Sequence, residues 1–201
     1  MNVLIVIDTR YGKTHRLALA VAEGARSVAG ADVKLVRARD TGTEGLPLDE
    51  RRRKAHEAFT KLPEATTDDL VWSDALILGS PTRFGNMTAP LKAFIDSTSK
   101  VWMEGGLVGK VGGCFTSSSS MHGGQETTLI SMMFSMFHQG MIVVGIPYSE
   151  PQLVATTRGG TPYGASSVSG PASDQGPNDD ELALAQALGK RVAEVASKLR
   201  S

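Results

Sequence analysis

Five short runs of strand-forming residues, separated by segments with helical periodicity, constrain the fold of this chain more than any other feature. The runs are Val3–Ile7, Asp32–Ala38, Ala75–Leu78, Val111–Phe115 and Met141–Ile146. Short continuous apolar runs are typical of strands buried on both faces of a parallel sheet. The alternating second run is typical of a strand near the sheet edge. Together they predict an α/β fold, a doubly wound five-stranded parallel sheet with helices on both faces.

The helical segments occupy the intervals between these strands. Apolar residues recur at helical spacing from Leu17 to Val28, in Ala89–Thr98, in Gln125–His138 and in Asn178–Leu199. Gln125–His138 is apolar around much of its circumference, which fits either a core helix or a subunit interface. A solvated helix is expected from Leu48 to Lys61, and the Gly/Ser/Pro-rich segment Gly159–Pro177 is expected to be a loop.

The length and composition predict one globular domain, residues 1–201, because a 201-residue chain with 41% hydrophobic residues can bury one core but hardly two. Within it, the polar stretch Asp40–Asp69 reads as an insertion after the second strand. The 21 basic residues balance 21 acidic ones, which disfavours nucleic acid as a partner. The basic run Arg51–Lys54 could contact nucleic acid, but the neighbouring Asp49, Glu50 and Glu57 favour an ordinary solvated helix face.

Cysteine usage and hydropathy bear on the compartment. Cys114 is the only cysteine, which excludes an internal disulfide and a cysteine-built metal site and agrees with a reducing cytoplasm. The N-terminus shows no signal-peptide pattern, and no apolar run reaches membrane-spanning length. We therefore expect a soluble cytoplasmic protein without membrane insertion.

The loop after the first strand invites comparison with nucleotide-binding loops, because it ends in Gly12-Lys13-Thr14. A triphosphate loop requires a glycine at position 7, where this chain has Ile7. The spacing of Thr9, Gly12 and Thr14 suits a single phosphate monoester instead, held by hydroxyls and N–H groups at a helix N-terminus without a metal. An ordinary strand-to-helix turn with a threonine near the cap explains the same residues equally well.

Two further loops are expected at the same edge, because the carboxyl ends of parallel strands lie together and ligands bind there. The loop after the third strand offers Pro81, Thr82, Arg83, Phe84, Gly85 and Asn86, and the loop after the fourth offers Ser117, Ser118, Ser119, Ser120, Met121, His122 and Gly123. These supply a turn, hydroxyls, a fixed positive charge, an aromatic face and close backbone approach. Flavin mononucleotide (FMN), with its phosphate, polyol and planar ring, fits the three loops together.

Several longer motifs extend this interpretation. They are Thr9–Thr14 (TRYGKT), Pro81–Met87 (PTRFGNM), His122–Thr128 (HGGQETT) and Gly159–Ala165 (GGTPYGA). Through these motifs, in the same order and over nearly the whole chain, the sequence resembles the WrbA-type NAD(P)H:quinone oxidoreductases of the flavodoxin-like superfamily. PTRFGN and GGQETT are the specific motifs, whereas the first loop alone would fit any flavodoxin-like protein.

The resemblance implies a role for each of these segments. It implies that Thr9, Arg10, Tyr11, Gly12, Lys13 and Thr14 bind the flavin phosphate, that the second and third loops bind the ribityl chain and ring, and that His138 lies by the flavin. It implies that Tyr11 contacts the nicotinamide nucleotide, NADH or NADPH, and that Trp102 helps to wall the substrate space. Relatives form homotetramers in which neighbours help to close each active site.

Two departures from the family pattern bear on the site. Asp8 replaces a residue that is usually aromatic, so a carboxylate would weaken phosphate binding unless Arg10 or Lys13 offsets it. Relatives often carry a histidine pair where this chain has His138 and Gln139, so a role for the second histidine does not carry over. Taken without the resemblance, His138 could be a helix-end cap, Trp102 could pack under the Gly105-Gly106 turn, and Cys114 would be an inert small hydrophobe.

These observations predict an FMN-dependent enzyme that takes hydride from NADH or NADPH and reduces a quinone at the same flavin face, by ping-pong kinetics. Arg83 and loop N–H groups would stabilise charge on the reduced ring. The main alternative is a one-electron carrier of the flavodoxin type, although such carriers are usually strongly acidic. A flavin-free regulatory module is a third class. Its phospho-receiver form is disfavoured, since Gly79-Ser80 follows the third strand without an aspartate to phosphorylate.

Overall fold

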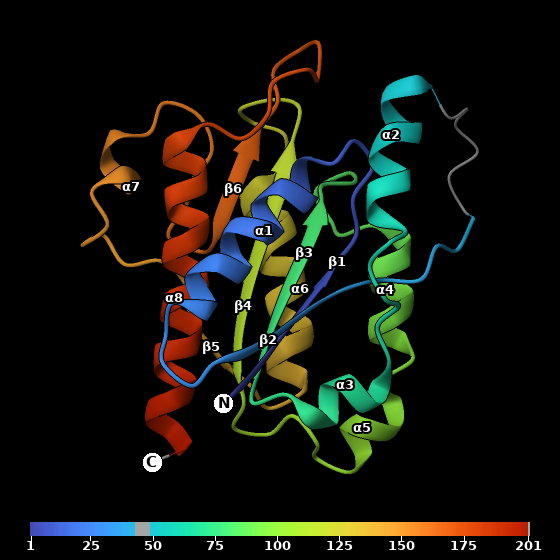
Figure 1. Cartoon of the computed structure of the whole chain (residues 1–201), viewed down its shortest axis with the longest axis vertical. Coiled ribbons are helices and arrows are strands. Elements are labelled where there is room, and N and C mark those ends of the chain that lie inside the picture. Colours follow the sequence, from blue (N-terminus) through green and yellow to red (C-terminus); the bar gives the residue numbers. More distant parts are fainter. Residues whose placement is uncertain (43–48, 201) are drawn as a thin grey trace.

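The computed structural model describes residues 1–42 and 49–200, so the predicted helix start at Leu48 lies outside the described residues. Its centre is a parallel sheet with the strand order β2-β1-β3-β4-β5 (Figure 1). The strands on this path are β1 (Asn2–Ile7), β2 (Asp32–Arg37), β3 (Ala75–Pro81), β4 (Val111–Ser118) and β5 (Ile142–Val143). The predicted doubly wound parallel fold is thereby confirmed.

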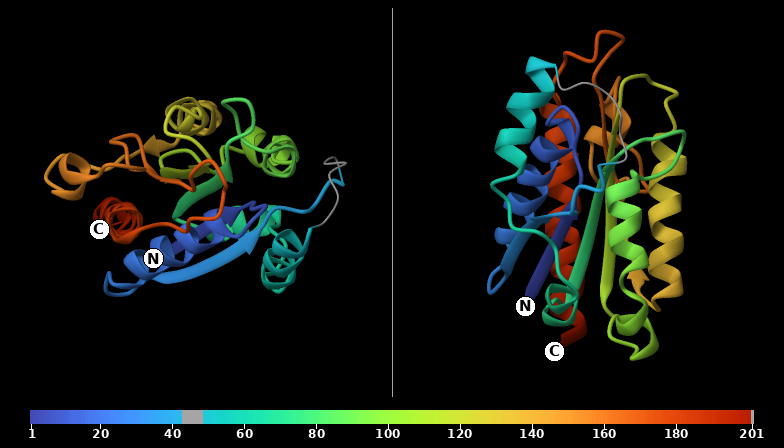
Figure 2. Two further views of the ribbon diagram at one scale, coloured as in Figure 1. Left: turned by 90° about the horizontal axis from the view of Figure 1, so that it is seen from above. Right: turned by 90° about the vertical axis from the view of Figure 1, so that its right-hand side faces the viewer.

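Helices cover both faces of the sheet. Figure 2 shows α1 (Lys13–Arg26) and α8 (Asp179–Arg200) on one face, and α4 (Ala89–Asp96) and α6 (Gln125–His138) on the other. The described segment between β2 and β3 contains α2 (Glu50–Phe59) and α3 (Thr67–Trp72). Two short helices complete the order, α5 (Ser99–Met103) after α4 and α7 (Gln152–Ala155) after β5. The sequence analysis did not predict α3, α5 or α7.

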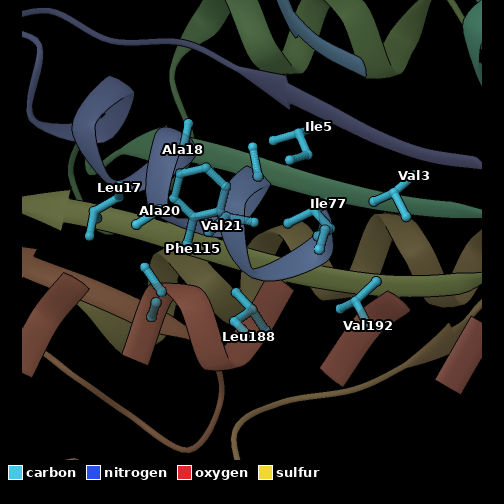
Figure 3. Close-up of a cluster of buried hydrophobic side chains, with 14 of the residues drawn as sticks. Val3, Ile5, Leu17, Ala18, Ala20, Val21, Ile77, Phe115, Leu188 and Val192 are labelled. Atoms are coloured by element: carbon cyan, nitrogen blue, oxygen red, sulfur yellow. The ribbon is translucent and has the colours of Figure 1, made fainter. Parts of the chain in front are cut away.

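Strand β1 shows why the sheet needs helices on both faces. Its side chains alternate, so that Val3, Ile5 and Ile7 join the core under α1 and α8, while Leu4 and Val6 join the core under α4 and α6. All five are fully buried. Burying a side chain of this size is worth about 1.5–3 kcal/mol, and a strand that is apolar on both sides gains this only between two helix layers. Figure 3 shows the first of these cores, with Phe115 beside Leu17 and Val21 of α1.

Helices α1 and α8 pack unusually closely because each has a glycine at the crossing. A Cβ atom on Gly189 would lie 1.9 Å from the Val21 carbonyl oxygen, and one on Gly24 would lie 1.9 Å from the Gln186 carbonyl oxygen. Neither helix could therefore carry a larger residue there without moving apart. This contact fixes the second half of α1 against α8.

The fifth strand is shorter than the sequence predicted. Only Ile142 and Val143 of the expected run Met141–Ile146 pair with β4. The chain then leaves the sheet, and the backbone at Pro162 approaches so closely that a Cβ on Gly145 would lie 2.1 Å from its carbonyl oxygen. A sixth strand, β6 (Ala165–Val168), pairs in parallel with the other half of the β4 edge, from Phe115 to Ser118. The sheet thus has six strands rather than five.

The ends of the remaining predicted elements agree with the structure to within a few residues. Among residues 1–42 and 49–200, no helix combines the length and apolar character that crossing a membrane requires.

Candidate functional site

A pocket lies at the carboxyl ends of β1, β3 and β4, the edge to which the strand arrows point in Figure 1. It is lined by Thr9, Arg10, Tyr11, Lys13, Thr14, Pro81, Thr82, Arg83, Ser117, Ser118, Ser119, Ser169 and Ser173. Parallel β1, β3 and β4 run side by side, so the loops that follow them meet here. The first eleven of these residues come from the three loops that the sequence analysis predicted.

The first loop is built to hold an anion. Gly12 adopts a left-handed conformation, with φ of 77°, and α1 begins at the next residue without a side-chain cap. The Thr14 hydroxyl lies 2.9 Å from the Ser117 hydroxyl. The Thr9 hydroxyl oxygen is buried and has no hydrogen-bond partner within the described part of the chain. Free N–H groups at a helix start and an unsatisfied buried hydroxyl favour a bound acceptor such as phosphate.

Asp8 and Arg10 form an ion pair beside this loop. The Arg10 Nε atom lies 3.8 Å from the Asp8 Oδ2 atom, and both side chains are more than nine-tenths buried. An unpaired carboxylate would repel a phosphate at this depth. The positive charge of Arg10 offsets the Asp8 carboxylate beside the loop.

The second loop turns sharply after β3. Arg83 and Asn86 exchange two backbone hydrogen bonds, of 2.7 and 2.9 Å, and the turn between them holds Phe84 at φ of 51° and Gly85 at φ of 75°. Thr82 is oriented because its hydroxyl accepts from the Thr128 hydroxyl at 2.8 Å and donates to the Gly123 carbonyl at 3.3 Å. Phe84 is fully exposed. Of the predicted residues here, Pro81, Thr82 and Arg83 line the pocket, whereas Phe84, Gly85 and Asn86 do not.

The third loop contributes hydroxyl groups. Ser117, Ser118 and Ser119 line the pocket, and the remaining predicted residues of this loop, Ser120, Met121, His122 and Gly123, lie outside its lining. The Ser120 carbonyl accepts from the Ser118 hydroxyl at 2.7 Å and from the Gln125 side chain at 3.1 Å. These bonds hold the loop against the start of α6, so that its first three serines face the pocket.

A fourth segment was missed from the sequence. Ser169 and Ser173, between β6 and α8, also line the pocket. Ser169 donates from its backbone N–H and its hydroxyl to the Ser118 carbonyl, at 2.9 and 3.1 Å. The segment was expected to be a loop, and only its serine content could have signalled a place in the site.

Glu181 anchors this fourth segment. Its carboxylate is fully buried and accepts from the backbone N–H groups of Gly159, Val168 and Asn178 at 2.8–2.9 Å. Arg158 lies 3.5 Å from the same carboxylate. A buried carboxylate with three donors and a cation is well compensated, so it fixes the strand that leads into Ser169.

Two predicted site residues lie at the opposite end of the molecule. Helix α6 starts beside the third loop and runs its 14 residues away from it, so His138, at its end, lies about 20 Å from its start at a rise of about 1.5 Å per residue. Trp102 donates its indole N–H to the His138 carbonyl at 2.8 Å. Within one chain, His138 and Trp102 therefore lie together but away from the pocket, and the expectation that His138 lies by the flavin stays a prediction.

The local environment shifts the pKa of two notable groups. Burial, with the charges of Arg51 and Arg16, lowers the pKa of Lys13 in the first loop. Burial raises the pKa of the Cys114 thiol far above its ordinary value, and its sulfur lies 3.8 Å from the Met136 sulfur. Cys114 is therefore an unreactive core residue, as the sequence suggested.

The family relationship follows from comparison with known proteins. The family model described as NADPH-dependent FMN reductase matches residues 1–150 of the chain. The chain belongs to this family. It is 45% identical over 201 residues to a protein of Syntrophobacter fumaroxidans named NAD(P)H dehydrogenase (quinone), covering 99% of this chain and 98% of that protein. A protein of the same name from Geobacter metallireducens is 44% identical to this chain, and the alignment covers 100% of both chains.

The fold of the family is flavodoxin-like. A crystal structure of a flavodoxin, WrbA-like protein from Agrobacterium tumefaciens superposes with a TM-score of 0.71 and 27% sequence identity, covering 98% of each chain.

The residues of the pocket fit FMN, the group that the family implies. The α1 start and the hydroxyls of Thr9 and Thr14 suit its phosphate. The serines of the third loop suit the polyol of its ribityl chain, and Pro81–Arg83 suit the edge of its ring. The orphaned Thr9 hydroxyl is the strongest sign of a ligand, since buried hydroxyls are otherwise satisfied.

Proposed function

We propose that the protein is an FMN-dependent NAD(P)H:quinone oxidoreductase that reduces quinones to hydroquinones by two electrons. The observation that carries this proposal is the hydroxyl-lined pocket at the carboxyl ends of β1, β3 and β4, in a chain of the FMN reductase family. FMN, when bound there, supplies the chemistry of hydride uptake and release. The named relatives support quinones and nicotinamide nucleotides as the substrates.

The side chains then bind and orient rather than react covalently. Thr9, Thr14 and the first turn of α1 hold the phosphate, and Thr82, locked by Thr128, holds the polyol or ring. Arg83, which lines the pocket, would hold its fixed positive charge near a bound flavin ring and would stabilise negative charge that develops there. Tyr11 lines the pocket and is 39% exposed, and in this proposal it would contact the nicotinamide nucleotide.

The proposal includes ping-pong kinetics. A planar nicotinamide and a planar quinone would share one exposed ring face, so the oxidised nucleotide must leave before the quinone enters. Parallel lines in double-reciprocal plots at several quinone concentrations would support this order. Intersecting lines would contradict it.

The proposal also includes a homotetramer in which a neighbouring chain completes the site. An exposed apolar cluster at the amino end of the sheet supports it. The cluster comprises Trp102, Met103, Val108, Phe134, Phe137 and Ile142, all at least 44% exposed. Large exposed apolar patches mark interaction sites. Trp102 and His138 would then reach the pocket of a neighbour rather than their own.

The oligomer is tested by light scattering on a size-exclusion column. The unmodified protein is expected to run as a tetramer of 21.3 kDa chains, and Phe137→Glu is expected to dissociate it. Val154→Glu, which alters an exposed residue of α7, serves as the matched control. A monomeric unmodified protein would contradict the assembly.

The chemistry is tested by anaerobic stopped-flow absorbance of FMN-loaded protein, mixed first with NADH or NADPH and then with benzoquinone. Bleaching of the flavin band by either nucleotide, and full recovery with quinone, would support the enzyme. Free FMN under the same conditions is the control. If the flavin binds but neither nucleotide reduces it, the one-electron carrier becomes the better interpretation.

A cytoplasmic location is part of the proposal and rests on the single buried cysteine.

A further inference from the structure

The loop between β6 and α8, residues 169–176, is held down by cationic side chains from three separate parts of the chain. Arg51 of α2 donates to the Ala172 and Ser173 carbonyls, and Lys13 of α1 donates to the Asp174 carbonyl at 3.0 Å. Arg158, after α7, donates to the carbonyls of Val168, which precedes the loop, and Gly176, the loop's last residue. This loop carries Ser169 and Ser173 into the pocket.

Arg51 spans the outer side of the first loop. Its guanidinium carbon lies 5.8 Å from the centre of the Tyr11 ring, a cation–π distance, and its N–H groups reach the 169–176 loop on the far side. Tyr11, Lys13 and Ser173 all line the pocket. Arg51 therefore bridges α2 and the 169–176 loop across the end of the pocket where the first loop lies.

The four cations at this end of the pocket, Arg10, Arg158, Lys13 and Arg51, face different kinds of acceptor. Arg10 faces Asp8 and Arg158 faces Glu181, so both of these cations have a carboxylate nearby. Lys13 and Arg51 instead donate to neutral carbonyl oxygens, and Asp174, whose charge acts on Lys13, is the only acidic residue of the 169–176 loop. Burial, followed by repulsion from Arg51 and Arg16, lowers the pKa of Lys13. Cations form shorter and stronger hydrogen bonds to anions than to neutral carbonyls, so this arrangement favours an incoming anion.

We propose that Arg51 and Lys13 form a cationic clasp that closes the 169–176 loop over the phosphate of FMN and slows its release. The inference rests on the proposed function, because it takes FMN as the cofactor. It adds a charged contact from α2 to a phosphate site otherwise made of hydroxyls and N–H groups. The sequence favoured a solvated helix face for the basic run Arg51–Lys54. The proposed clasp gives one residue of this run, Arg51, a role in binding.

The phosphate makes the test specific, because riboflavin carries the same ring and polyol without it. We would measure the dissociation constants and release rates of FMN and riboflavin by flavin fluorescence. The variants are Arg51→Gln, Arg51→Lys and the control Arg53→Gln. Arg53 is exposed on the same helix and, two residues away, faces a different side. Arg51→Gln is expected to weaken FMN binding about tenfold to hundredfold, the range for losing a hydrogen bond to a charged group.

The other expected results follow from the same contact. Riboflavin binding should be unchanged in every variant, FMN release should be faster in Arg51→Gln, and Arg51→Lys should retain part of the affinity. The unmodified protein should bind FMN with a stronger salt dependence than riboflavin. This last measurement needs no variant and stands even if Arg51→Gln fails to fold.

Three results would overturn the clasp. Equal losses for FMN and riboflavin in Arg51→Gln would mean that Arg51 only holds the loop in shape. Equal FMN binding in Arg51→Gln and Arg53→Gln would mean that Arg51 does not contact the phosphate. Equal salt dependence for the two flavins would mean that no cation of the protein acts specifically on the phosphate. If the unmodified protein binds neither flavin, the proposed function itself fails, and this outcome differs from all three.

Discussion

The hydroxyl of Thr14, in the first turn of α1, lies 2.9 Å from the hydroxyl of Ser117, near the end of β4. The two residues are 103 positions apart in the chain and both are buried. This hydrogen bond joins the loop that is suited to a phosphate to the loop that is suited to a polyol. It places two hydroxyls where one ligand can use both.

We expect Thr14→Val to weaken FMN binding by about tenfold, because it removes a hydroxyl next to a charged acceptor and leaves the Ser117 hydroxyl unpaired. Thr14→Ser keeps the hydroxyl and serves as the control. Flavin fluorescence titration measures both. Unchanged affinity in Thr14→Val would show that the phosphate lies elsewhere.

The affinity for FMN should fall with rising pH as Lys13 loses its proton. The pKa of Lys13 is lowered by burial, with Arg51, Arg16 and Arg158 lowering it further and Asp174 opposing them. The loss is therefore expected below the usual lysine range, and Lys13→Arg should move it to higher pH. Riboflavin, titrated over the same range, controls for ionisation of the flavin ring. A pH profile that is identical for the two flavins would contradict the assignment.

The apoprotein should lose stability as the pH falls below about 6.5, the ordinary histidine pKa, because of His15. Burial lowers the pKa of His15 in the folded protein, where its ring packs edge-on against Phe59 at 6.4 Å. The unfolded chain therefore takes up a proton at higher pH than the folded chain does, and the free energy of unfolding decreases through this window.

Urea unfolding at pH 7.5 and pH 5.5 tests this expectation. His15→Gln should reduce the pH dependence, whereas His56→Gln, at an exposed position of α2, should leave it unchanged. The same pH dependence in all three proteins would assign the effect to other groups.

Gly189→Ala should destabilise the protein although alanine is the better helix former. The new Cβ would lie 1.9 Å from the Val21 carbonyl oxygen of α1. Overpacking of this kind costs about 1–3 kcal/mol, against a helix-propensity gain of about 1 kcal/mol. Thermal unfolding measures the difference, with Ala187→Gly on the same helix as the control for helix propensity at a half-buried position. A raised melting temperature in Gly189→Ala would show that the helices can separate freely.

Much of the fold could be predicted because most of its helices and strands follow from local patterns of apolar residues. Helix α6 begins at Gln125 and ends at His138 as predicted, and β1 is buried on both faces as its continuous apolar run indicated. The run Met141–Ile146 was misleading, because the close approach of Pro162, a contact between distant segments, takes the chain out of the sheet after Val143. Strand β6 reads Ala-Ser-Ser-Val and has no apolar pattern of its own. Its burial comes from tertiary contacts, namely its pairing with β4 and its packing against α8 and α1.

The candidate site, like the fold, could be predicted only where it depends on local sequence patterns. Three loops that directly follow strands were predicted as neighbours, since parallel strands end at one edge. Ser169 and Ser173 were not placed there, because their positions depend on how Glu181 anchors β6. Trp102 and His138 show the opposite case, in which motif position suggested a site that one chain does not assemble. That FMN binds these residues stays a prediction.

The divided edge of β4 bears on how this fold tolerates added sequence. Val144 donates to the Gly112 carbonyl at 2.8 Å and Ala165 pairs with Phe115, so the excursion between them leaves and rejoins one strand only three positions apart, about 10 Å at a strand's rise per residue. Its tip near Val154 is exposed, and lengthening a loop whose ends are already fixed costs little entropy. A reporter peptide or a second domain could be grafted there, at the side of the sheet, while the loops that form the pocket keep their register.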